Sequence, residues 1–364
     1  MARRALRPAA LRVAAEVTRR WRPYSRLFVV GEPVRWVIGE ELDEITRLAK
    51  PLGIKLAAPW PLTAARGQAV FFGSHFVLFD GFPEGRDHRL GAAYFHGRPG
   101  TPGMPEFDRA YAALRSRHSE LHRIQVSHRE MEEIVLSSGI DPAKVFRIPI
   151  GIAPRYFPPQ TPASRSAARR ALGLPEGAFV VGSFQKDGVG WAEGRDPKWI
   201  KGPDVLVAAL TALFAHVPEL HVLLSGPARG YVRAELDQRR IPYVHRVLER
   251  YADVGDLYAA LDAYVVPARQ EGGPKGVLEA MSSAVPLVTT RVGQAADLVH
   301  DGENGWLVEV GDAEAIADRL ERISVGLDDV RRVIEAGLAT AAANSYEAQL
   351  PLWRAFFTGF VESA

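Results

Sequence analysis

The feature that most constrains the fold is an alternation of short β-prone apolar runs with amphipathic helical segments, which occurs twice along the chain. The first series of expected strands comprises Leu27–Val30, Lys55–Ala58, Ala69–Phe72, Ala92–Phe95, Ile124–Ser127 and Val145–Pro149. The second series comprises Phe179–Ser183, His221–Ser225, Tyr264–Pro267, Pro286–Thr290 and Gly305–Val308. Helices are expected at Arg129–Ser138, Asp204–Phe214, Tyr231–Arg239, Lys275–Ser283 and Ala313–Ile323. Because strands that alternate with helices pair in parallel through right-handed crossovers, each series predicts one doubly wound α/β domain.

A proline-rich segment separates the two series and predicts the domain boundary. Residues 158–164 read Pro-Pro-Gln-Thr-Pro-Ala-Ser and have no periodicity, as is typical of a linker. At 364 residues the chain is long enough for two domains of roughly 150–200 residues each. We expect a first domain over residues 1–155, a second over 156–345 and a C-terminal helix over 346–364. That helix is rich in aromatic residues, and it either crosses back to the first domain or is an ordinary core helix.

The composition excludes several kinds of site. There is no cysteine, which rules out disulfide scaffolds, zinc–thiolate sites, iron–sulfur clusters and a cysteine nucleophile, and which fits a reducing cytoplasm. Lys and Arg number 45 against 43 Asp and Glu, so the net charge of +2 gives no support for a nucleic-acid partner. No apolar run approaches the roughly 18–20 residues that are needed to span a bilayer.

The N-terminal residues 1–26 predict a basic amphipathic helix. They carry eight arginines against a single acid, Glu16. Apolar residues recur at helical spacing in the same stretch, at Leu6, Ala10, Val13, Val17 and Trp21. Two interpretations stay open: a surface helix that packs on its own domain, or a helix that lies on an anionic membrane surface.

The common nucleotide-binding and hydrolytic motifs do not occur. No Gly-x-Gly-x-x-Gly opens a helix after the first strand, and there is no Gly-x-x-x-x-Gly-Lys-Ser/Thr, His-Glu-x-x-His or Gly-x-Ser-x-Gly. The sequence therefore disfavours dehydrogenases, P-loop ATPases, zinc proteases of that type and α/β-hydrolases.

The second series instead carries a glycine-rich loop between an apolar strand and a helix. It reads Glu-Gly-Gly-Pro-Lys-Gly-Val-Leu-Glu-Ala-Met over residues 271–281. The two glycines allow backbone to approach a ligand, Pro274 suits a first helical position, and a helix start can hold a phosphate. Glu271 and Glu279 carry carboxylates, which can accept hydrogen bonds from sugar hydroxyls, so that each can bind one end of the same ligand.

This loop resembles the donor site of retaining glycosyltransferases of family 4, which are two-domain enzymes of the GT-B fold. The matching residues are Glu-x7-Glu within Glu-Gly-x-Pro-x-x-x-Leu-Glu-Ala-Met, then Val-Pro-Leu-Val at 285–288 and Val-Gly-Gln-Ala-Ala-Asp-Leu-Val at 292–299. Lys201-Gly202-Pro203-Asp204 resembles the Lys-Gly that begins the family's first donor-domain helix. The match covers residues 123–310 well and the first 120 poorly.

The resemblance implies two Rossmann-like domains whose parallel sheets face a central cleft. It implies that Glu271 binds hydroxyls of the transferred sugar, that Glu279 binds the ribose, and that Lys201 meets the diphosphate. The same resemblance places His96 near the transferred sugar and assigns donor contacts to Gly272, Gly273, Lys275 and Gly276.

The sequence departs from the family pattern near the diphosphate. The family has an arginine after the strand glycine, whereas this chain has Gly182-Ser183. Lys186 supplies the second charge or Gln185 contacts phosphate as a neutral donor, and a long insertion over residues 187–199 follows. The first domain has no glycine-rich loop after its first strand. Its acceptor-side candidates are Ser74 and His75, which follow the expected strand Ala69–Phe72.

The function that the resemblance implies is a metal-independent hexosyltransferase-like activity without a cofactor. A sugar would pass from a nucleotide sugar to a saccharide or lipid-linked acceptor by front-face attack, with the leaving phosphate as base, in glycan, glycolipid or envelope polysaccharide synthesis. The expected location is the cytoplasm or the inner face of the membrane. Three alternatives stay open: a sugar-nucleotide epimerase, a phosphorylase, or a catalytically degenerate subunit that binds sugar nucleotides.

Overall fold

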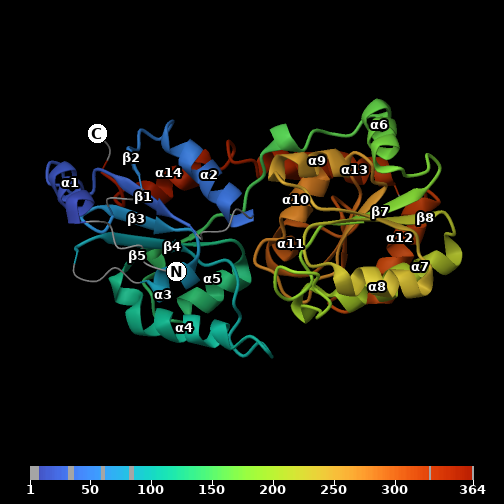
Figure 1. Ribbon diagram of the computed structural model, residues 1–364, viewed down its shortest axis with the longest axis horizontal. Coiled ribbons are helices and arrows are strands. Elements are labelled where there is room, and N and C mark those ends of the chain that lie inside the picture. The colour runs from blue at the N-terminus through green and yellow to red at the C-terminus, as the bar shows by residue number, and fades with distance from the viewer. Residues whose placement is uncertain (1–7, 32–36, 59–61, 82–85, 328, 363–364) are drawn as a thin grey trace. The chain divides into compact units, whose positions relative to one another are not determined.

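The computed structural model describes residues 8–31, 37–58, 62–81, 86–327 and 329–362. The chain divides into two compact units (Figure 1). Unit 1 contains Met1–Pro149 and Gln349–Ala364, and unit 2 contains Ile150–Ala348. The expected boundaries at 155/156 and 345/346 lie six and three residues from the divisions at 149/150 and 348/349.

Unit 1 is built on a six-stranded sheet in the order β2-β1-β3-β4-β5-β6, with every strand pair parallel. Its strands are β1 (Leu27–Val30), β2 (Leu56–Ala57), β3 (Ala69–Phe72), β4 (Arg89–Ala93), β5 (Leu121–Val126) and β6 (Val145–Arg147). Its helices are α1 (Pro8–Thr18), α2 (Val37–Ala49), α3 (His75–Asp80), α4 (Pro105–Arg117), α5 (Arg129–Leu136) and α14 (Leu350–Phe357), with 3-10 turns η1 (His118–Glu120) and η2 (Pro142–Lys144).

Alternating side chains of β3 bury the two faces of this sheet against different helices. Val70 and Phe72 belong to a core that also contains buried residues of α3, α4 and α5. Phe71 points to the opposite face, where its ring centroid lies 6.1 Å from that of Trp353 and 5.5 Å from that of Phe356, both on α14. The last helix of the chain therefore completes the core of unit 1 (Figure 1).

Unit 2 contains a second six-stranded parallel sheet, in the order β12-β11-β10-β7-β8-β9. Its strands are β7 (Phe179–Ser183), β8 (Leu220–Ser225), β9 (Tyr243–Arg246), β10 (Ala263–Val266), β11 (Leu287–Thr290) and β12 (Trp306–Val308). Its helices are α6 (Pro162–Leu172), α7 (Pro203–His216), α8 (Gly230–Arg239), α9 (Val254–Tyr258), α10 (Lys275–Ser282), α11 (Gly293–Leu298), α12 (Ala313–Ser324) and α13 (Val330–Ala343), with 3-10 turns η3 (Pro154–Tyr156), η4 (Trp199–Lys201) and η5 (Tyr251–Asp253).

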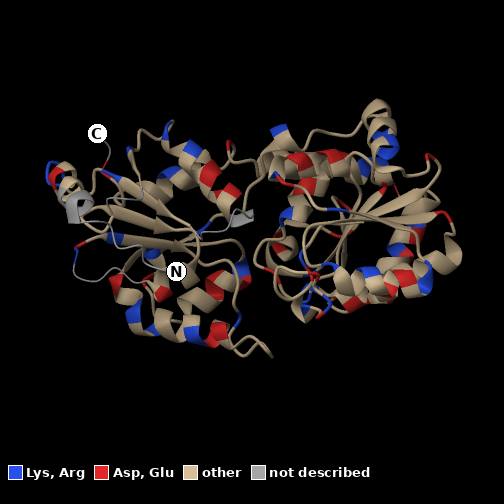
Figure 2. Cartoon of the chain, in the orientation of Figure 1, with Lys and Arg blue, Asp and Glu red and all other residues tan. Residues whose placement is uncertain are grey.

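The two-residue period of the strands gives unit 2 a core on each side of its sheet. Val180 and Tyr264 pack in a cluster with buried side chains of α9 and α10. Their neighbours Val181 and Val265 pack in the other cluster, with α7, α8 and α12. Acidic and basic residues mix along the helices of both units (Figure 2).

The linker and one strand of unit 2 differ from the expectation. The linker expected over residues 158–164 ends in the first turn of α6, because Thr161 and Ser164 form a reciprocal capping box and Pro162 occupies the first helical turn. The sequence did not predict β9, a short strand at the sheet edge whose side chains are only partly buried or exposed.

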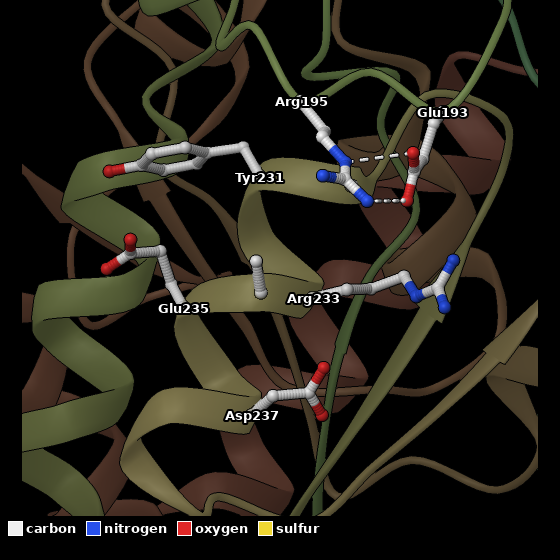
Figure 3. A pocket seen from close by; sticks show the side chains of 8 residues that line it. Glu193, Arg195, Tyr231, Arg233, Glu235 and Asp237 are labelled. Carbon is white, nitrogen blue, oxygen red and sulfur yellow. Dashed lines mark hydrogen bonds and ion pairs between the residues drawn. The ribbon is translucent and has the colours of Figure 1, made fainter.

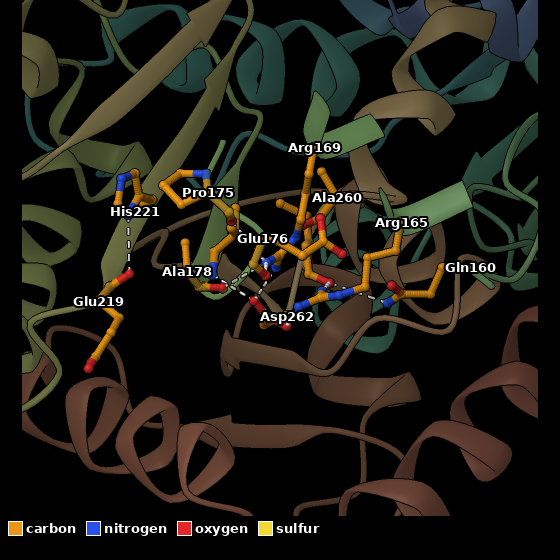
Figure 4. A network of polar contacts seen from close by, with 12 residues as sticks. Gln160, Arg165, Arg169, Pro175, Glu176, Ala178, Glu219, His221, Ala260 and Asp262 are labelled. Carbon is orange, nitrogen blue, oxygen red and sulfur yellow. Dashed lines mark hydrogen bonds and ion pairs between the residues drawn. The ribbon is translucent and has the colours of Figure 1, made fainter. Parts of the chain in front are cut away.

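A buried network joins α6 to the amino ends of β7 and β10 (Figure 4). The Arg169 side chain is fully buried and donates to the carbonyl oxygens of Ala260, Glu176 and Ala178. Its Nη2 also lies 2.6 Å from Asp262 Oδ2, while Arg165 pairs with the other oxygen of that carboxylate at 2.7 Å. The network fixes the strand ends opposite to those that carry the predicted site.

The N-terminal helix is shorter than predicted. The expected helix spans 1–26, of which residues 1–7 lie outside the described residues, and α1 ends at Thr18. Trp21 lies beyond it and packs against Phe28 of the sheet, with ring centroids 6.0 Å apart. Val13 and Val17 are 57% and 43% exposed, whereas Ala14 and Thr18 are buried. Among the described residues, no helix has both the length and the apolar character that a bilayer span requires.

Candidate functional site

The predicted donor residues of unit 2 gather at one edge of its sheet. Strands β7 and β10 are parallel neighbours, so their carboxyl ends lie side by side. Gln185 and Lys186 follow β7, and Glu271 and the glycine loop follow β10. The adjacent strand ends bring residues that are far apart in the sequence together. Ligands of open α/β sheets bind at this edge.

Lys201 and Glu271 are in direct contact. The Lys201 ammonium donates to Glu271 Oε1, and the two side chains are 22% and 13% exposed. Lys201 ends η4, and Gly202 follows in the left-handed region at φ 64°. A Cβ at Gly202 would lie 2.0 Å from the carbonyl oxygen of Pro267, so only glycine permits this approach of η4 to the end of β10.

Gln185 and Lys186 lie beside this pair. The Gln185 side-chain amide donates to the Lys201 carbonyl oxygen at 2.8 Å, so that Gln185 positions the Lys201 backbone. Lys186 Nζ donates to the Gly188 carbonyl at 3.1 Å and lies 4.9 Å from the ring centroid of Trp191. Burial, followed by the positive charge of Lys201, lowers the pKa of Lys186. Two ammonium groups therefore share this edge, which is suited to an anion.

The glycines of the loop are needed for packing. A Cβ at Gly273 would lie 2.6 Å from Ile150 Cδ1 and 2.7 Å from Gln294 Oε1. A Cβ at Gly276 would lie 2.6 Å from the Tyr264 ring, and the Gly272 carbonyl accepts from the Gln294 backbone at 3.0 Å. Close approach to protein neighbours thus explains Gly273 and Gly276. Pro274 is the cap that precedes α10, one residue earlier than the first helical position expected for it.

Gln294 supports the loop, although the sequence did not assign it a role. It is fully buried, its Oε1 accepts from the Ile150 backbone at 2.9 Å, and its Nε2 donates to the Ile150 carbonyl at 3.3 Å. The only sequence feature that pointed to Gln294 was its place in the segment 292–299, which resembles the family.

Glu279 lies inside unit 2, where it is only 5% exposed. Its Oε1 accepts from the Tyr251 hydroxyl at 2.5 Å and its Oε2 from the Tyr258 hydroxyl at 2.9 Å. Lys275, which is also buried, has its ammonium 4.8 Å from the Tyr251 ring centroid. Burial raises the pKa of Glu279, and the Tyr251 hydrogen bond, the Lys275 charge and the Tyr258 hydrogen bond oppose that rise.

A buried ion pair holds the insertion over residues 187–199 against the end of β7. Arg229 Nε lies 2.9 Å from Asp187 Oδ1, and both side chains are essentially inaccessible. Arg229 also donates to the carbonyl oxygens of Ser183 and Ser225. Burial raises the pKa of Asp187, and the Arg229 charge opposes that rise. Backbone hydrogen bonds from Lys198 to Asp187 at 2.7 Å and within the insertion complete an ordered hairpin.

A hollow of about 300 Å³ lies between this insertion and α8 (Figure 3). The insertion supplies Glu193 and Arg195, and α8 supplies Tyr231, Arg233 and Glu235. Its charges are mixed, and Glu193 already pairs with Arg195 at 2.9 Å. None of the residues predicted for the donor site lines it.

The acceptor-side candidates lie in unit 1, after β3 and β4. Ser74 and His75 are 5% and 1% exposed, and the His75 ring stacks on Tyr94 with centroids 3.8 Å apart. Burial, followed by the nearby charge of His96, lowers the pKa of His75 well below its usual value, so that its imidazole is neutral. His96 is partly exposed and its ring centroid lies 5.9 Å from that of His75. Ser127 and His128, which follow β5, were not predicted; their Oγ and Nδ1 atoms lie 3.0 Å apart.

The sequence comparisons point to glycosyltransferases. Residues 190–324 match the family described as Glycosyl transferases group 1. The lipopolysaccharide core biosynthesis mannosyltransferase LpsB of Rhizobium meliloti is 30% identical over 250 residues, which is 64% of this chain and 66% of that protein. A D-inositol 3-phosphate glycosyltransferase of Xylanimonas cellulosilytica is 31% identical over 230 residues, 60% of this chain and 51% of that protein. The chain thus spans about half to two thirds of the length of these curated relatives.

The comparison with solved structures establishes the fold. Anabaena HepE in complex with UDP-glucose has a TM-score of 0.73 at 16% identity, over 92% of this chain and 99% of HepE. Sucrose-phosphate synthase of Thermosynechococcus elongatus has a TM-score of 0.63 at 20% identity, over 80% of this chain and 74% of that one. The GT-B fold predicted from the motifs is confirmed, and the predicted resemblance is confirmed as far as glycosyltransferases in general. The chain is related to the group 1 glycosyl transferases and has the GT-B fold.

Proposed function

We propose that this protein transfers a sugar from a nucleotide-sugar donor to an acceptor hydroxyl with retention of anomeric configuration, as a metal-independent glycosyltransferase of family 4. The observation that carries the proposal is the contact between Lys201 and Glu271 at the carboxyl edge of β7 and β10. It joins the Lys201 ammonium, a cation suited to binding phosphate, to the Glu271 carboxylate, which is suited to accepting hydrogen bonds from sugar hydroxyls. The UDP-glucose complex of HepE, a protein of the same fold, supports a nucleotide-sugar donor.

Each group of the donor has a counterpart in unit 2. The ammonium groups of Lys201 and Lys186 stabilise the negative charge that develops on the leaving diphosphate, a task that does not then require a metal ion. Glu271 accepts hydrogen bonds from hydroxyls of the transferred sugar, and Glu279 from those of the ribose. Backbone N–H groups at the start of α10 add donors for phosphate. The departing phosphate takes the proton of the acceptor hydroxyl.

We assign the acceptor to unit 1, with His96 among the side chains that contact the reacting sugar. Relatives named for lipopolysaccharide core biosynthesis and for inositol phosphate support a saccharide or lipid-linked acceptor in envelope glycan synthesis. Such acceptors are consistent with a protein at the cytoplasmic face of the membrane.

Incubation with a panel of nucleotide sugars tests this function. We expect release of nucleoside diphosphate from one donor, in the presence of EDTA, and loss of that release in Glu271→Ala. The anomeric proton couplings of the product, measured by NMR, should match those of the donor. An inverted product, or a strict requirement for added metal, contradicts the proposed mechanism.

A degenerate subunit is the second candidate, because Ser183 stands where family members have an arginine. Such a subunit would bind a nucleotide sugar tightly without turnover towards any acceptor. Calorimetric binding combined with the absence of product would favour it.

We expect Lys186→Met to weaken binding of nucleoside diphosphates roughly tenfold, because a charge-assisted contact with phosphate is lost. Binding of the corresponding nucleoside, which has no phosphate, should not change. Isothermal titration of UDP, GDP and ADP, each compared with its nucleoside, measures both effects. Equal affinities of wild type and variant for all three diphosphates would remove Lys186 from the site.

Helix α1 gives a prediction about membranes. Val13 and Val17 are exposed, and the side chains of Arg19 and Arg20 are 72% and 80% exposed. We propose that this surface contacts anionic lipid, where each cation contributes about 1 kcal/mol. The double variant Arg19→Glu/Arg20→Glu should lower binding to phosphatidylglycerol vesicles at least tenfold in co-sedimentation. Unchanged binding, or equal binding of wild type to phosphatidylcholine vesicles, contradicts this.

A further inference from the structure

Two tyrosines from different elements enclose the carboxylate of Glu279. Tyr258 ends α9, is fully buried and donates to Oε2 at 2.9 Å. Tyr251 opens η5, is partly buried and donates to Oε1 at 2.5 Å. Each oxygen therefore receives one phenolic hydrogen bond, from opposite ends of the η5–α9 segment.

Aromatic packing fixes the inner tyrosine. The ring centroid of Tyr258 lies 4.9 Å from that of Phe184, 5.0 Å from that of Tyr264 and 5.8 Å from that of Phe157. The outer tyrosine is held by the Lys275 ammonium, 4.8 Å from its ring centroid. Both hydroxyls are thus presented to Glu279 by rings with little freedom to move.

The count of hydrogen bonds shows what the carboxylate still has available. Each carboxylate oxygen can accept two hydrogen bonds. Among the described residues, one tyrosine takes one position on each oxygen, so one position on each remains, which matches the two neighbouring hydroxyls of a ribose.

We propose that Tyr251 and Tyr258 are positioning residues that hold Glu279 ready to accept both ribose hydroxyls, and that through Glu279 they set a preference for ribonucleotides over 2′-deoxyribonucleotides. This inference rests on the proposed function, because it requires that the protein binds a nucleotide. A 2′-deoxyribose offers one hydroxyl, so it gains less from a carboxylate oriented for two.

The test compares UDP, GDP and ADP, each with its 2′-deoxy analogue, by isothermal titration. Wild type should bind the better ribonucleotide at least tenfold more tightly than its deoxy analogue. Tyr258→Phe and Tyr251→Phe should each weaken binding of the ribonucleotide roughly tenfold and that of the deoxy analogue much less, because each removes a hydrogen bond to a charged group. The ratio between the two nucleotides should therefore fall.

The dependence on pH separates positioning from a structural defect. Among the described residues, the titratable groups that face Glu279 are Tyr251 of η5, Tyr258 of α9, Tyr264 of β10 and Lys275 of α10. Loss of the Tyr251 donor raises the pKa of Glu279 further, so more of the carboxyl is protonated in acid. We expect the defect of Tyr251→Phe to be larger at about pH 5 than at about pH 8.

The controls make each outcome decisive. Tyr111→Phe removes a phenolic hydrogen bond to Ser137 in unit 1 and should leave nucleotide binding unchanged. In a Glu279→Gln background, Tyr258→Phe should have no further effect on the ratio. If wild type discriminates and both tyrosine variants keep the same ratio at both pH values, the inference is wrong while the proposed function stands. If wild type binds none of UDP, GDP, ADP and their 2′-deoxy analogues, both are wrong. Should Tyr258→Phe fail to fold, the partly buried Tyr251 carries the same test.

Discussion

Lys201→Met is expected to lower kcat by roughly 10²–10³-fold, as the loss of a preorganised group at a developing charge does in other enzymes. Lys201 contacts Glu271 and lies at the edge where β7 and β10 end together. Removing its ammonium takes a positive charge from the leaving diphosphate and also leaves Glu271 without its partner. Because the Lys201 side chain is 22% exposed, the fold should survive. Initial rates of nucleoside diphosphate release measure the effect.

Lys198→Met is the matched control for this prediction. Lys198 lies three residues earlier in the same segment, so the variant loses one cation nearby while the Lys201–Glu271 contact is kept. Its kcat should stay within about threefold of wild type. If both variants lose activity equally, the effect is one of general charge and Lys201 has no special role.

Arg169→Met is expected to lower the free energy of unfolding of unit 2 by about 3–5 kcal/mol, the usual cost of breaking a buried charge pair. The variant removes the Arg169 donor from the carbonyl oxygens of four residues and from Asp262 Oδ2, which keeps its hydrogen bond from the Val180 backbone. For a domain of this size such a loss lowers Tm by roughly 10 °C. Thermal unfolding followed by circular dichroism gives the number.

Arg165→Met tests whether burial is the cause. Arg165 is on the same helix and pairs with the other oxygen of Asp262, but its side chain is 28% exposed. Since exposed ion pairs contribute little, its loss should cost no more than about 1 kcal/mol. Equal losses in the two variants would contradict the explanation. Both should keep the kcat of wild type, because the network lies at the amino ends of the strands.

The strands were predictable wherever an apolar run is long enough to be buried on both faces. The bounds of β1, β3 and β7 agree with the prediction residue for residue. Strand β4 starts at Arg89, three residues before the predicted start at Ala92. The prediction missed these residues because they include a half-buried arginine and a glycine, which have low β-propensity. The start of helix α6 was taken for linker because Thr161 and Pro162 are common in both linkers and helix starts.

The candidate site could be predicted only where its residues lie in one motif. Glu271, Glu279 and the glycines are close in the sequence, and Lys201 carried a recognisable Lys-Gly. The tyrosines that hold Glu279 come from η5 and α9, whose short segments have no periodic pattern. The Asp187–Arg229 pair joins residues 42 positions apart, a distance at which charge pairing cannot be inferred from one sequence.

The return of α14 to unit 1 has a consequence for biosynthesis. Trp353, Phe356 and Phe360 are fully buried in unit 1, yet the ribosome makes them only after all of unit 2. Domains usually fold in the order of their synthesis, the N-terminal one first. The part of unit 1 that α14 covers, including Phe71, therefore stays open until translation has passed residue 360. During that interval nascent chains present an apolar surface, which is the kind of surface that chaperones bind.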